Sequence, residues 1–526
     1  MPIVARSLLE RQITYSEARK EETTNILREL TYVTLAASFR DHIEKKSATI
    51  KAIVAHHLYL TPASCRVKIS DRSEWLNGSF NLCVPVSIQN QNQKSSRRVL
   101  MRFPLPYKVA GPNNGDEKIR CEAATYAWLN QECPNIPTAC LRGFGLSTGQ
   151  RFTAIRNASL LTRCLQYLRR QILSLFRCPA PCQYMKHQTS APDEFGIGYL
   201  LLDYVEDGKM LSQSYAEQSQ DTTLRSNLFR DLAKIQLTLS QKPLPCIGSL
   251  TIDDDGVLSL NNRPFTLEVC QMENEKIPVE ISRGTTYSTV DTYIHDLLSL
   301  HDNRLRYQPN GASSIQDCIS QMSALSTMRT IYSDFFDRKL RSGPFILTLT
   351  DLHTSNFFVD DNWHITNLVD LEWACIRPIE MQHPPYWLTS QAVDRIDEDR
   401  YSEICSEFID ILEEEEKKLV EERLLEMVED DLSYTELLKR LWRQGTFWYC
   451  LALDSPTGLH HIFYNRIRPR YQIPYKQPEE SKFDDAFYIA APTFWSSKAW
   501  DFMISKAEDK EQYDKQLLYA FEVHSL

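Results

Sequence analysis

Residues 343–373 contain three polar side chains whose types and spacing suit the transfer of a phosphoryl group. Asp351 is followed by Asn356 and, further along, by Asp370. Phosphoryl transfer needs one carboxylate to accept the proton of the attacking hydroxyl and oxygen ligands that hold Mg²⁺ against the phosphates. Because Mg²⁺ keeps several of its water ligands, one carboxylate and one amide oxygen are sufficient. The three side chains therefore indicate magnesium-assisted phosphoryl transfer.

Three short strands must position these side chains. Residues 345–349 form an apolar run that ends at the polar loop 350–355. Residues 357–360 and 363–369 have the pattern of a hairpin whose two strands are joined by an Asp-Asn turn. The segment is therefore expected to form a strand, a polar loop and a hairpin.

The register of this hairpin decides where Asp370 lies. Pairing of Asp360 with Trp363 brings Asp370 back opposite His353, next to the loop that contains Asp351. The spacing Asp-x4-Asn is that of the catalytic loop of kinases. Taken alone it also fits a polar turn with incidental acids, but the hairpin and the second aspartate favour the functional interpretation.

The rest of the chain alternates between helical and strand patterns. Leu27, Leu30, Val33 and Leu35 predict one apolar stripe in the first helical segment. The predicted elements are helices over 15–58, strands within 66–103, a helix over 117–131, strands around 138–144 and 151–155, a continuous strand over 197–206, and a largely helical remainder.

A basic amphipathic stretch lies inside residues 157–195. It carries Arg163, Arg169, Arg170 and Arg177 among leucines. Such a stretch suits a membrane surface or an anionic partner. The favoured interpretation is a helix that packs on its own domain and leaves a basic face in solvent.

These elements predict an α+β fold with two lobes. Residues 1–62 form an N-terminal helical extension, and residues 63–205 a small β-rich N-lobe that contains the helical insertion around 157–195. Residues 206–526 form a larger helical C-lobe, which includes the catalytic loop 349–373 and a C-terminal helical elaboration. Small-molecule sites form preferentially at such interfaces between lobes.

The composition limits the partners and the compartment. The 526 residues carry a net charge of −10, whereas nucleic-acid binding usually requires a basic surface. The fourteen cysteines are scattered singly, the chain starts without a signal-peptide pattern, and no apolar run is long enough to span a membrane. We expect a cytoplasmic protein without nucleic acid, membrane span or obligate protein partner.

The segments TLTDLHTSNFFVD and ITNLVDLEW resemble the catalytic motif of the aminoglycoside phosphotransferase family, a branch of the protein-kinase-like fold. The resemblance covers roughly residues 66–385 and is strongest to the long fungal members. It implies a bilobal fold, ATP and Mg²⁺ as cofactors, Asp351 as catalytic base, and Asn356 and Asp370 as magnesium ligands. Glu372 is implied to assist at the metal.

The same resemblance implies that the N-lobe holds the nucleotide. Residues 75–81 resemble the family's nucleotide loop, in which Gly78 lets the backbone approach a phosphate and Ser79 donates to it. As a lone Asn-Gly-Ser turn, the segment also fits an ordinary hairpin.

Three further nucleotide contacts follow from the resemblance alone. The strand VLMRF places Arg102 against the α- and β-phosphates, and the helix EKIRCEAATYAWL places Glu122 where it orients Arg102. The segment LLLDYVEDG would offer backbone groups between Tyr204 and Glu206 to the adenine.

Two positions depart from the family pattern. Leu349 replaces a histidine that braces the catalytic loop in many members. Arg102 replaces the usual lysine; arginine stays charged but is bulkier and binds phosphate as a fork.

The resulting prediction is an ATP- and Mg²⁺-dependent phosphotransferase that acts on a hydroxyl of a small molecule. Trp373, Tyr386 and Trp387 are candidates for the acceptor pocket, although core packing explains them equally well. The alternatives are a pseudokinase or nucleotide-binding regulatory module without transfer, and another chemistry on the same fold, such as nucleotidyl transfer.

Overall fold

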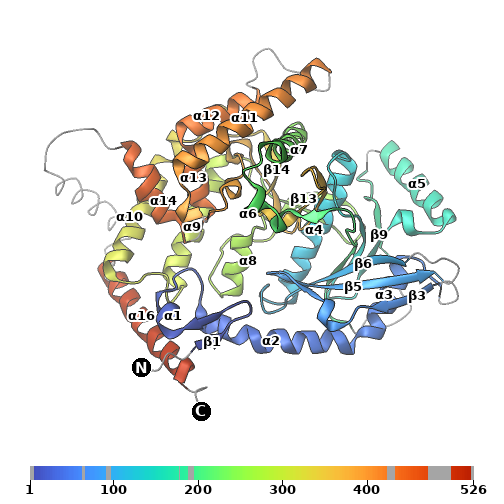
Figure 1. Ribbon diagram of the computed structural model, residues 1–526, viewed down its shortest axis with the longest axis horizontal. Coiled ribbons are helices and arrows are strands. Elements are labelled where there is room, and N and C mark those ends of the chain that lie inside the picture. Colours follow the sequence, from blue (N-terminus) through green and yellow to red (C-terminus); the bar gives the residue numbers. More distant parts are fainter. Residues whose placement is uncertain are drawn as a thin grey trace.

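A large antiparallel sheet and a mass of helices make up the two sides of the molecule (Figure 1). The computed structural model describes residues 5–61, 65–90, 96–176, 178–186, 195–391, 393–422, 433–455, 457–471 and 499–522. The mixture of helices with several antiparallel sheets confirms the predicted α+β class.

Eight strands of the described residues form the large sheet. Its order is β3-β5-β6-β10-β7-β8-β9, with β4 paired to β5, and all these neighbours are antiparallel. The strands are β3 Cys65–Ile69, β4 Leu76–Asn77, β5 Asn81–Asn90, β6 Ser96–Pro104, β7 Leu141–Gly145, β8 Arg151–Ala154, β9 Tyr184–Lys186 and β10 Tyr199–Asp203. Each run that was predicted as a strand between residues 66 and 206 contains a strand in the structure.

Helices cover both faces of this sheet. Successive side chains of a strand point to opposite faces. On β10, Leu201 joins the apolar cluster of α2 (Ile26–Lys45) and α3 (Ser47–His57), whereas Leu200 and Leu202 join the cluster that contains α4 (Pro112–Glu132). The sheet is therefore the middle layer of a sandwich, with α4 on the face that leads to the rest of the molecule.

The N-terminal extension is helical, as predicted, but its buried face differs from the predicted stripe. The helices are α1 Tyr15–Lys20, α2 Ile26–Lys45 and α3 Ser47–His57. Val33 and Leu35 of α2 are exposed, and its buried residues are Ile26, Tyr32, Phe39 and Ile43. The reason is that α2 contacts different neighbours along its length, so no single periodic stripe describes its contacts.

The helix α2 bridges the two sides of the molecule (Figure 1). Before it begins, the backbone carbonyl of Glu22 accepts hydrogen bonds from the side chains of Arg304 and Gln308 at 2.7 and 3.0 Å. Near its other end, Phe39 and Ile43 pack into the core of the sheet. The strands β1 (Ala5–Ser7) and β2 (Gln12–Thr14) precede α1, and Ile13 of β2 shares a small core with α16 (Ala499–Glu522), the last helix of the described residues.

The larger part of the chain is mainly helical and encloses short sheets. Its helices are α6 Tyr215–Gln218, α7 Thr222–Ser240, α8 Leu267–Asn274, α9 Val290–Tyr307, α10 Ile315–Ile331, α11 Glu398–Glu421, α12 Tyr434–Gln444, α13 Thr446–Leu453 and α14 Leu459–Ile462. Its strands are β11 Lys209–Met210, β12 Ser249–Ile252, β13 Leu258–Asn262, β14 Phe345–Leu349, β15 Phe357–Val359, β16 Ile365–Leu368 and β17 Ala374–Pro378.

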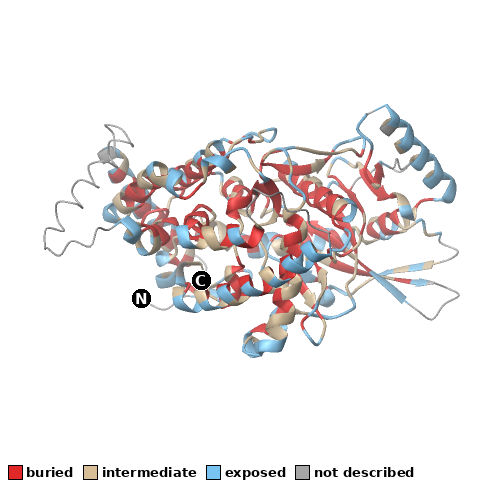
Figure 2. Cartoon of the chain, turned by 90° about the horizontal axis from the view of Figure 1, so that it is seen from above, coloured by how far each residue is buried: buried red, intermediate tan, exposed pale blue. Residues whose placement is uncertain are grey.

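The insertion contains a helix, α5 (Leu160–Leu175), at the margin of the molecule (Figure 2). The favoured interpretation of its packing is wrong, because its leucines other than Leu173 face solvent and its less apolar side faces the body. Arg177 lies outside the described residues. No helix in the described part of the chain is long and apolar enough to cross a membrane.

Candidate functional site

The loop that carries Asp351 begins where a buried strand ends. β14 pairs with β17 from Phe345 opposite Pro378 to Leu349 opposite Ala374. The hydroxyl of Thr350 donates to the carbonyl of Trp373 at 2.7 Å, which continues this pairing by one residue. Asp351 is thus held at the end of a rigid two-stranded element.

The hairpin after this loop forms, but its predicted register is wrong. Phe357 pairs with Leu368 and Phe358 with Asn367, and a bulge follows before Val359 pairs with Ile365. The turn is longer than two residues, and Trp363 within it has a positive φ of 61°. Asp370 therefore does not return opposite His353.

Asn356 links Asp351 to the strand that leads to Asp370. Its side-chain amide donates to the carbonyl of Asp351 at 2.8 Å, and its own carbonyl accepts from Val369 at 3.0 Å. Asn356 is 2% exposed. Asp370 follows Val369 with a left-handed φ of 63°, a conformation that Asp adopts more readily than most residues. The structure thus brings Asp351, Asn356 and Asp370 together, although the register of the hairpin differs from the predicted one.

The carboxyl group of Asp351 lies in an unusually negative environment. Burial raises its pKa to about 7, and the nearby carboxylates of Asp370, Glu372 and Glu268 add to the rise. A pKa near neutrality suits a general base. A group of carboxylates at one place also suits a cation.

Arg102 of β6 connects the sheet to this loop. Its guanidinium donates to Glu122 of α4 at 2.5 Å, to Glu372 at 2.8 Å and to Asp370. Arg102 is 5% exposed, and Glu122 is fully buried. Burial raises the pKa of Glu122 to about 7, although Arg102 lies beside it. The predicted pairing of Arg102 with Glu122 is present in the structure.

Lys118 and Asn81 complete this ion-pair cluster. The Lys118 ammonium pairs with Glu372, donates to the Asn81 side chain at 2.7 Å and lies 5.5 Å from the ring centre of Trp373. Asn81 in turn donates to Glu372 at 2.6 Å. Sequence reasoning missed Lys118. Its position one helical turn before Glu122 was the available signal, because residues i and i+4 share a helix face.

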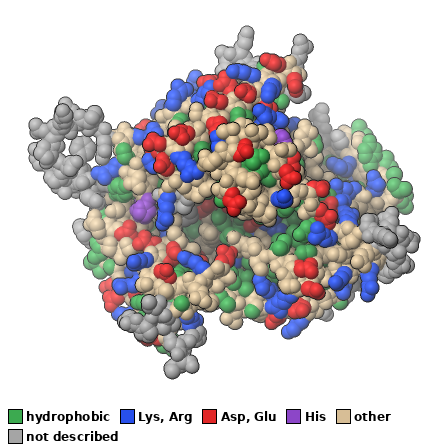
Figure 3. Space-filling model, viewed as in Figure 1, with side chains coloured by type: hydrophobic (Ala, Val, Ile, Leu, Met, Phe, Trp, Pro, Cys, Tyr) green, Lys and Arg blue, Asp and Glu red, His purple; other side chains and the backbone are tan. Residues whose placement is uncertain are grey.

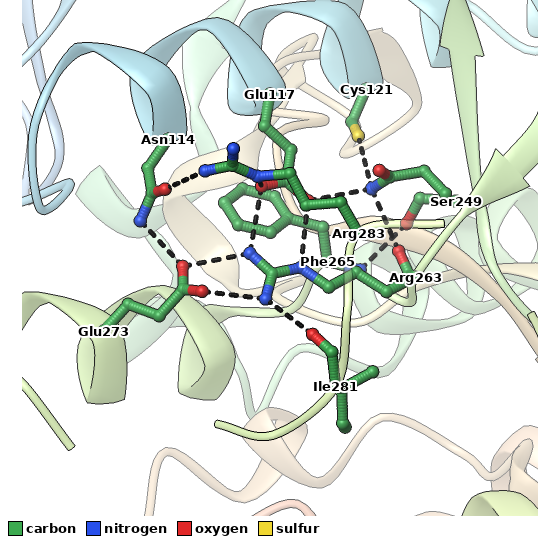
Figure 4. A network of polar contacts seen from close by, with 10 residues as sticks. Asn114, Glu117, Cys121, Ser249, Arg263, Phe265, Glu273, Ile281 and Arg283 are labelled. Atoms are coloured by element: carbon green, nitrogen blue, oxygen red, sulfur yellow. Dashed lines mark hydrogen bonds and ion pairs between the residues drawn. The ribbon is translucent and has the colours of Figure 1, made fainter. Parts of the chain in front are cut away.

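A second buried network fixes the helix that carries Lys118 and Glu122 (Figure 4). Glu117, near the start of α4, accepts from Arg263 at 2.9 and 3.0 Å and from Arg283 at 2.8 Å. Arg263 also pairs with Glu273 of α8 at 2.7 Å. These contacts join α4 to the helical part, so the cluster on α4 is held in place from both sides.

The remaining predicted nucleotide contacts lie on the surface of the sheet. Gly78 and Ser79 form an exposed turn between β4 and β5, where the Gly78 amide donates to the carbonyl of Asn81 at 2.9 Å. Little surrounds Gly78, since a Cβ built there meets only that carbonyl, at 3.6 Å. The turn leads directly to Asn81, whose side chain belongs to the ion-pair cluster.

Tyr204 and Glu206 follow β10 and both contact Arg98 of β6. The guanidinium of Arg98 lies 4.1 Å from the ring centre of Tyr204 and donates to Glu206 at 2.9 Å. The side chains of Tyr204 and Glu206 therefore hold the segment after β10 against β6. A nucleotide at this segment would be contacted by backbone groups.

A cavity of about 470 Å³ opens beside Asp351. Its lining includes Tyr386 and Trp387, which the sequence suggested for a pocket. Trp373, the third aromatic residue suggested, is instead buried between Lys118 and Phe80. The lining further includes Glu268. Burial, together with the nearby carboxylate of Asp454, raises the pKa of Glu268 to about 7.

Few side chains near Asp351 offer ligand atoms for a metal ion. Among the described residues, no group of three or more His, Cys, Asp or Glu side chains is arranged to hold a metal ion. Asn356 and Asp370 supply hard oxygen atoms, which suit Mg²⁺ with several retained waters. The Glu372 carboxylate already pairs with Arg102 and Lys118 and accepts from Asn81.

Comparison with known proteins adds no assignment. No protein-family model matches the chain, and no curated protein sequence matches it either.

Proposed function

We propose that this protein is an ATP- and Mg²⁺-dependent phosphotransferase that acts on a hydroxyl group of a small molecule. The observation that carries the proposal is the position of Asp351. It lies at the end of β14, is bonded through its carbonyl to Asn356, has Asp370 nearby, and borders a cavity of about 470 Å³. A base, two metal-type oxygen donors and an acceptor-sized cavity therefore meet at one place.

The two sides of the molecule take the roles of lobes in this proposal. The sheet with Arg102, together with α4 and Glu122, is the N-lobe, and the helical part with the loop 349–373 is the C-lobe. The pairing of Arg102 with Glu122 supports this assignment, because kinases pair a basic strand residue with a glutamate on a helix. The resemblance of the catalytic segment to aminoglycoside phosphotransferases leads to the same proposal.

In the reaction, ionised Asp351 accepts the proton of the acceptor hydroxyl as that oxygen attacks the γ-phosphate, while the bond from the γ-phosphorus to the β,γ-bridging oxygen breaks and ADP leaves. Asn356 holds the loop through its bond to the Asp351 carbonyl, and Arg102 is the proposed partner of the phosphates. Asn356 and Asp370 are the proposed ligands of Mg²⁺, which when bound neutralises phosphate charge. We assign Glu372 to the ion-pair cluster, because its carboxylate is already engaged by Arg102, Lys118 and Asn81.

One contact favours the second candidate, a pseudokinase that binds nucleotide without transfer. Arg102 donates directly to Asp370, the residue proposed to hold the metal. If nucleotide and Mg²⁺ do not displace this contact, Asp370 stays engaged and transfer fails.

A labelling experiment separates the two candidates. The protein is incubated with γ-labelled ATP, Mg²⁺ and a small-molecule extract, and Asp351→Asn serves as the matched inactive variant. A labelled product that only the wild type makes supports the phosphotransferase. A rise in melting temperature with Mg-ATP, without labelled product or ATP hydrolysis, would assign the pseudokinase; ligand at about 100 times its Kd stabilises by about 2.7 kcal/mol.

A further inference from the structure

The helix α5 presents its apolar side to solvent. Its exposed apolar residues are between 52% and 82% accessible: Leu160, Leu161, Leu165, Leu168, Ile172, Leu175 and Phe176. Figure 2 shows α5 as an exposed helix at the margin, and Figure 3 shows hydrophobic side chains gathered over it. Soluble proteins rarely leave a contiguous apolar surface of this kind without a use for it.

The orientation of α5 is the reverse of that of an ordinary surface helix. Leu161, Leu165, Leu168 and Ile172 are spaced by three or four residues and so share one face. The half-buried positions of α5, which face the body, are Thr162, Gln166, Arg170 and Leu173. A surface helix normally turns its apolar face to the core. This apolar face is therefore available to something outside the described structure.

The charge of the helix indicates what lies opposite this face. Residues 160–176 carry three arginines and no acidic residue, although the whole chain has a net charge of −10. Arg163 and Arg169 are exposed. A strongly amphipathic helix with leucines on one face and arginines beside them suits a surface that is both apolar and anionic.

The shape of the helix narrows the choice further. α5 packs on the short turn Ile155–Asn157 and lies at the edge of the molecule (Figure 1). With 16 residues it is about 24 Å long. An exposed apolar helix face at the edge of the molecule suits a bilayer, into which its side chains can sink, better than a protein partner, which would need a matching groove.

We propose that α5 binds the surface of a membrane that contains anionic lipids. The helix lies in the interface, with Leu161, Leu165 and Ile172 among the acyl chains and Arg169 at the headgroups. The acidic remainder of the protein is repelled by such a surface, so the molecule binds with α5 toward the lipid.

Vesicle flotation of the full chain tests this proposal. The protein is mixed with phosphatidylcholine vesicles, with and without phosphatidylserine. We expect binding only when phosphatidylserine is present, and weaker binding at high salt because the Debye length shortens. The double substitution Leu165→Gln/Ile172→Gln should weaken binding at least about tenfold, since two buried aliphatic side chains are lost. Arg169→Glu should reduce the preference for phosphatidylserine.

Matched substitutions on another surface control for the loss of apolar side chains. Ile504→Gln/Tyr519→Gln replaces two exposed residues of α16 and should leave vesicle binding unchanged. The proposal fails if the wild type binds neither vesicle, or if it binds both equally. It also fails if the chain dimerises without vesicles and Leu165→Gln/Ile172→Gln abolishes the dimer, because a second copy would then cover α5.

Discussion

The ammonium of Lys118 pairs with the carboxylate of Glu372, although these side chains are only 1% and 3% exposed. Lys118 lies on α4 and Glu372 on the loop after β16, so the pair joins the sheet side of the molecule to the segment 349–373. Removing Glu372 leaves the Lys118 ammonium away from water without the carboxylate that it pairs with, whereas removing Lys118 leaves Glu372 with Arg102. The pair is therefore a structural link as well as part of the charge at the site.

Lys118→Met should lower the free energy of unfolding by less than Glu372→Leu, for which we expect about 3–5 kcal/mol, because Arg102 still pairs with Glu372 when Lys118 is replaced. Combining it with Glu372→Leu should cost less than the sum of the two single substitutions, because contacting residues couple by about 0.5–3 kcal/mol. Urea unfolding of the four proteins gives this cycle. The exposed pair of Lys209 and Asp361 is the matched control, where we expect no measurable coupling. If the effects of the two substitutions on the free energy of unfolding were strictly additive, Lys118 and Glu372 would not be coupled.

The reaction should respond to pH through Asp351. Its pKa is raised to about 7, so the base is protonated in acid and becomes ionised as the pH rises through neutrality. Because kcat/KM reports groups of the free enzyme, its acid limb should have a midpoint near pH 7. A pH-rate profile of the transfer reaction checks this. A limb near pH 4 would mean that the base is an ordinary, solvated carboxylate.

Stability should depend on pH through Glu268, whose pKa rises from about 4.5 to about 7 on folding. Between these values the folded protein holds a proton that the unfolded chain has released. This contribution to stability is complete below pH 4.5 and is lost as the pH rises through 7. Relative to wild type, Glu268→Gln should therefore become more stable by up to about 1.4 kcal/mol per pH unit in this window.

The comparison is made by urea unfolding at several pH values between 5 and about 8. The quantity compared is the difference in the free energy of unfolding between Glu268→Gln and wild type. Histidines contribute equally to both proteins and so cancel; one of them is His301, whose pKa is lowered to about 4 by burial. A difference that does not change with pH would mean that Glu268 titrates normally in the folded protein.

Substitution of Asp370 should remove the effect of Mg²⁺ on nucleotide binding. In the wild type, titration with Mg²⁺ should tighten ATP binding, and in Asp370→Ala it should not, because the charge that offsets the metal is gone. Asn356→Ala should act in the same direction but more weakly, since an amide carries no formal charge. Isothermal titration calorimetry with and without Mg²⁺ measures both. An equal gain in all three proteins would place the metal elsewhere.

Much of the fold follows from local patterns in the sequence. The apolar runs of β5, β6 and β10 predict buried strands, since each faces helices on both sides of the sheet. The apolar run before Asp351 predicts β14 with the observed bounds of Phe345–Leu349. The α+β class follows from these elements, and Asp351, Asn356 and Asp370 are recognisable from type and spacing.

The predictions that were wrong or missing concern features that depend on contacts between segments distant in the sequence. The hairpin register shifts because the turn takes up extra residues, including Trp363 with its positive φ, and no two-residue turn rule contains that information. The face of α2 is set by the changing neighbours of a bridging helix. Lys118 was missed because its partners, Glu372 and Asn81, come from other elements of the fold.

The most direct test of the central claim is to compare Asp351→Asn with the wild type in transfer and in ATP binding. The base acts in the transition state, so the variant should lose phosphoryl transfer and acceptor-free ATP hydrolysis while its ATP affinity stays within about tenfold. Asp361→Asn, the same change at an exposed turn of the neighbouring hairpin, is the matched control and should stay fully active. Equal activity in Asp351→Asn and wild type would contradict the assignment of Asp351 and, with it, the proposed reaction.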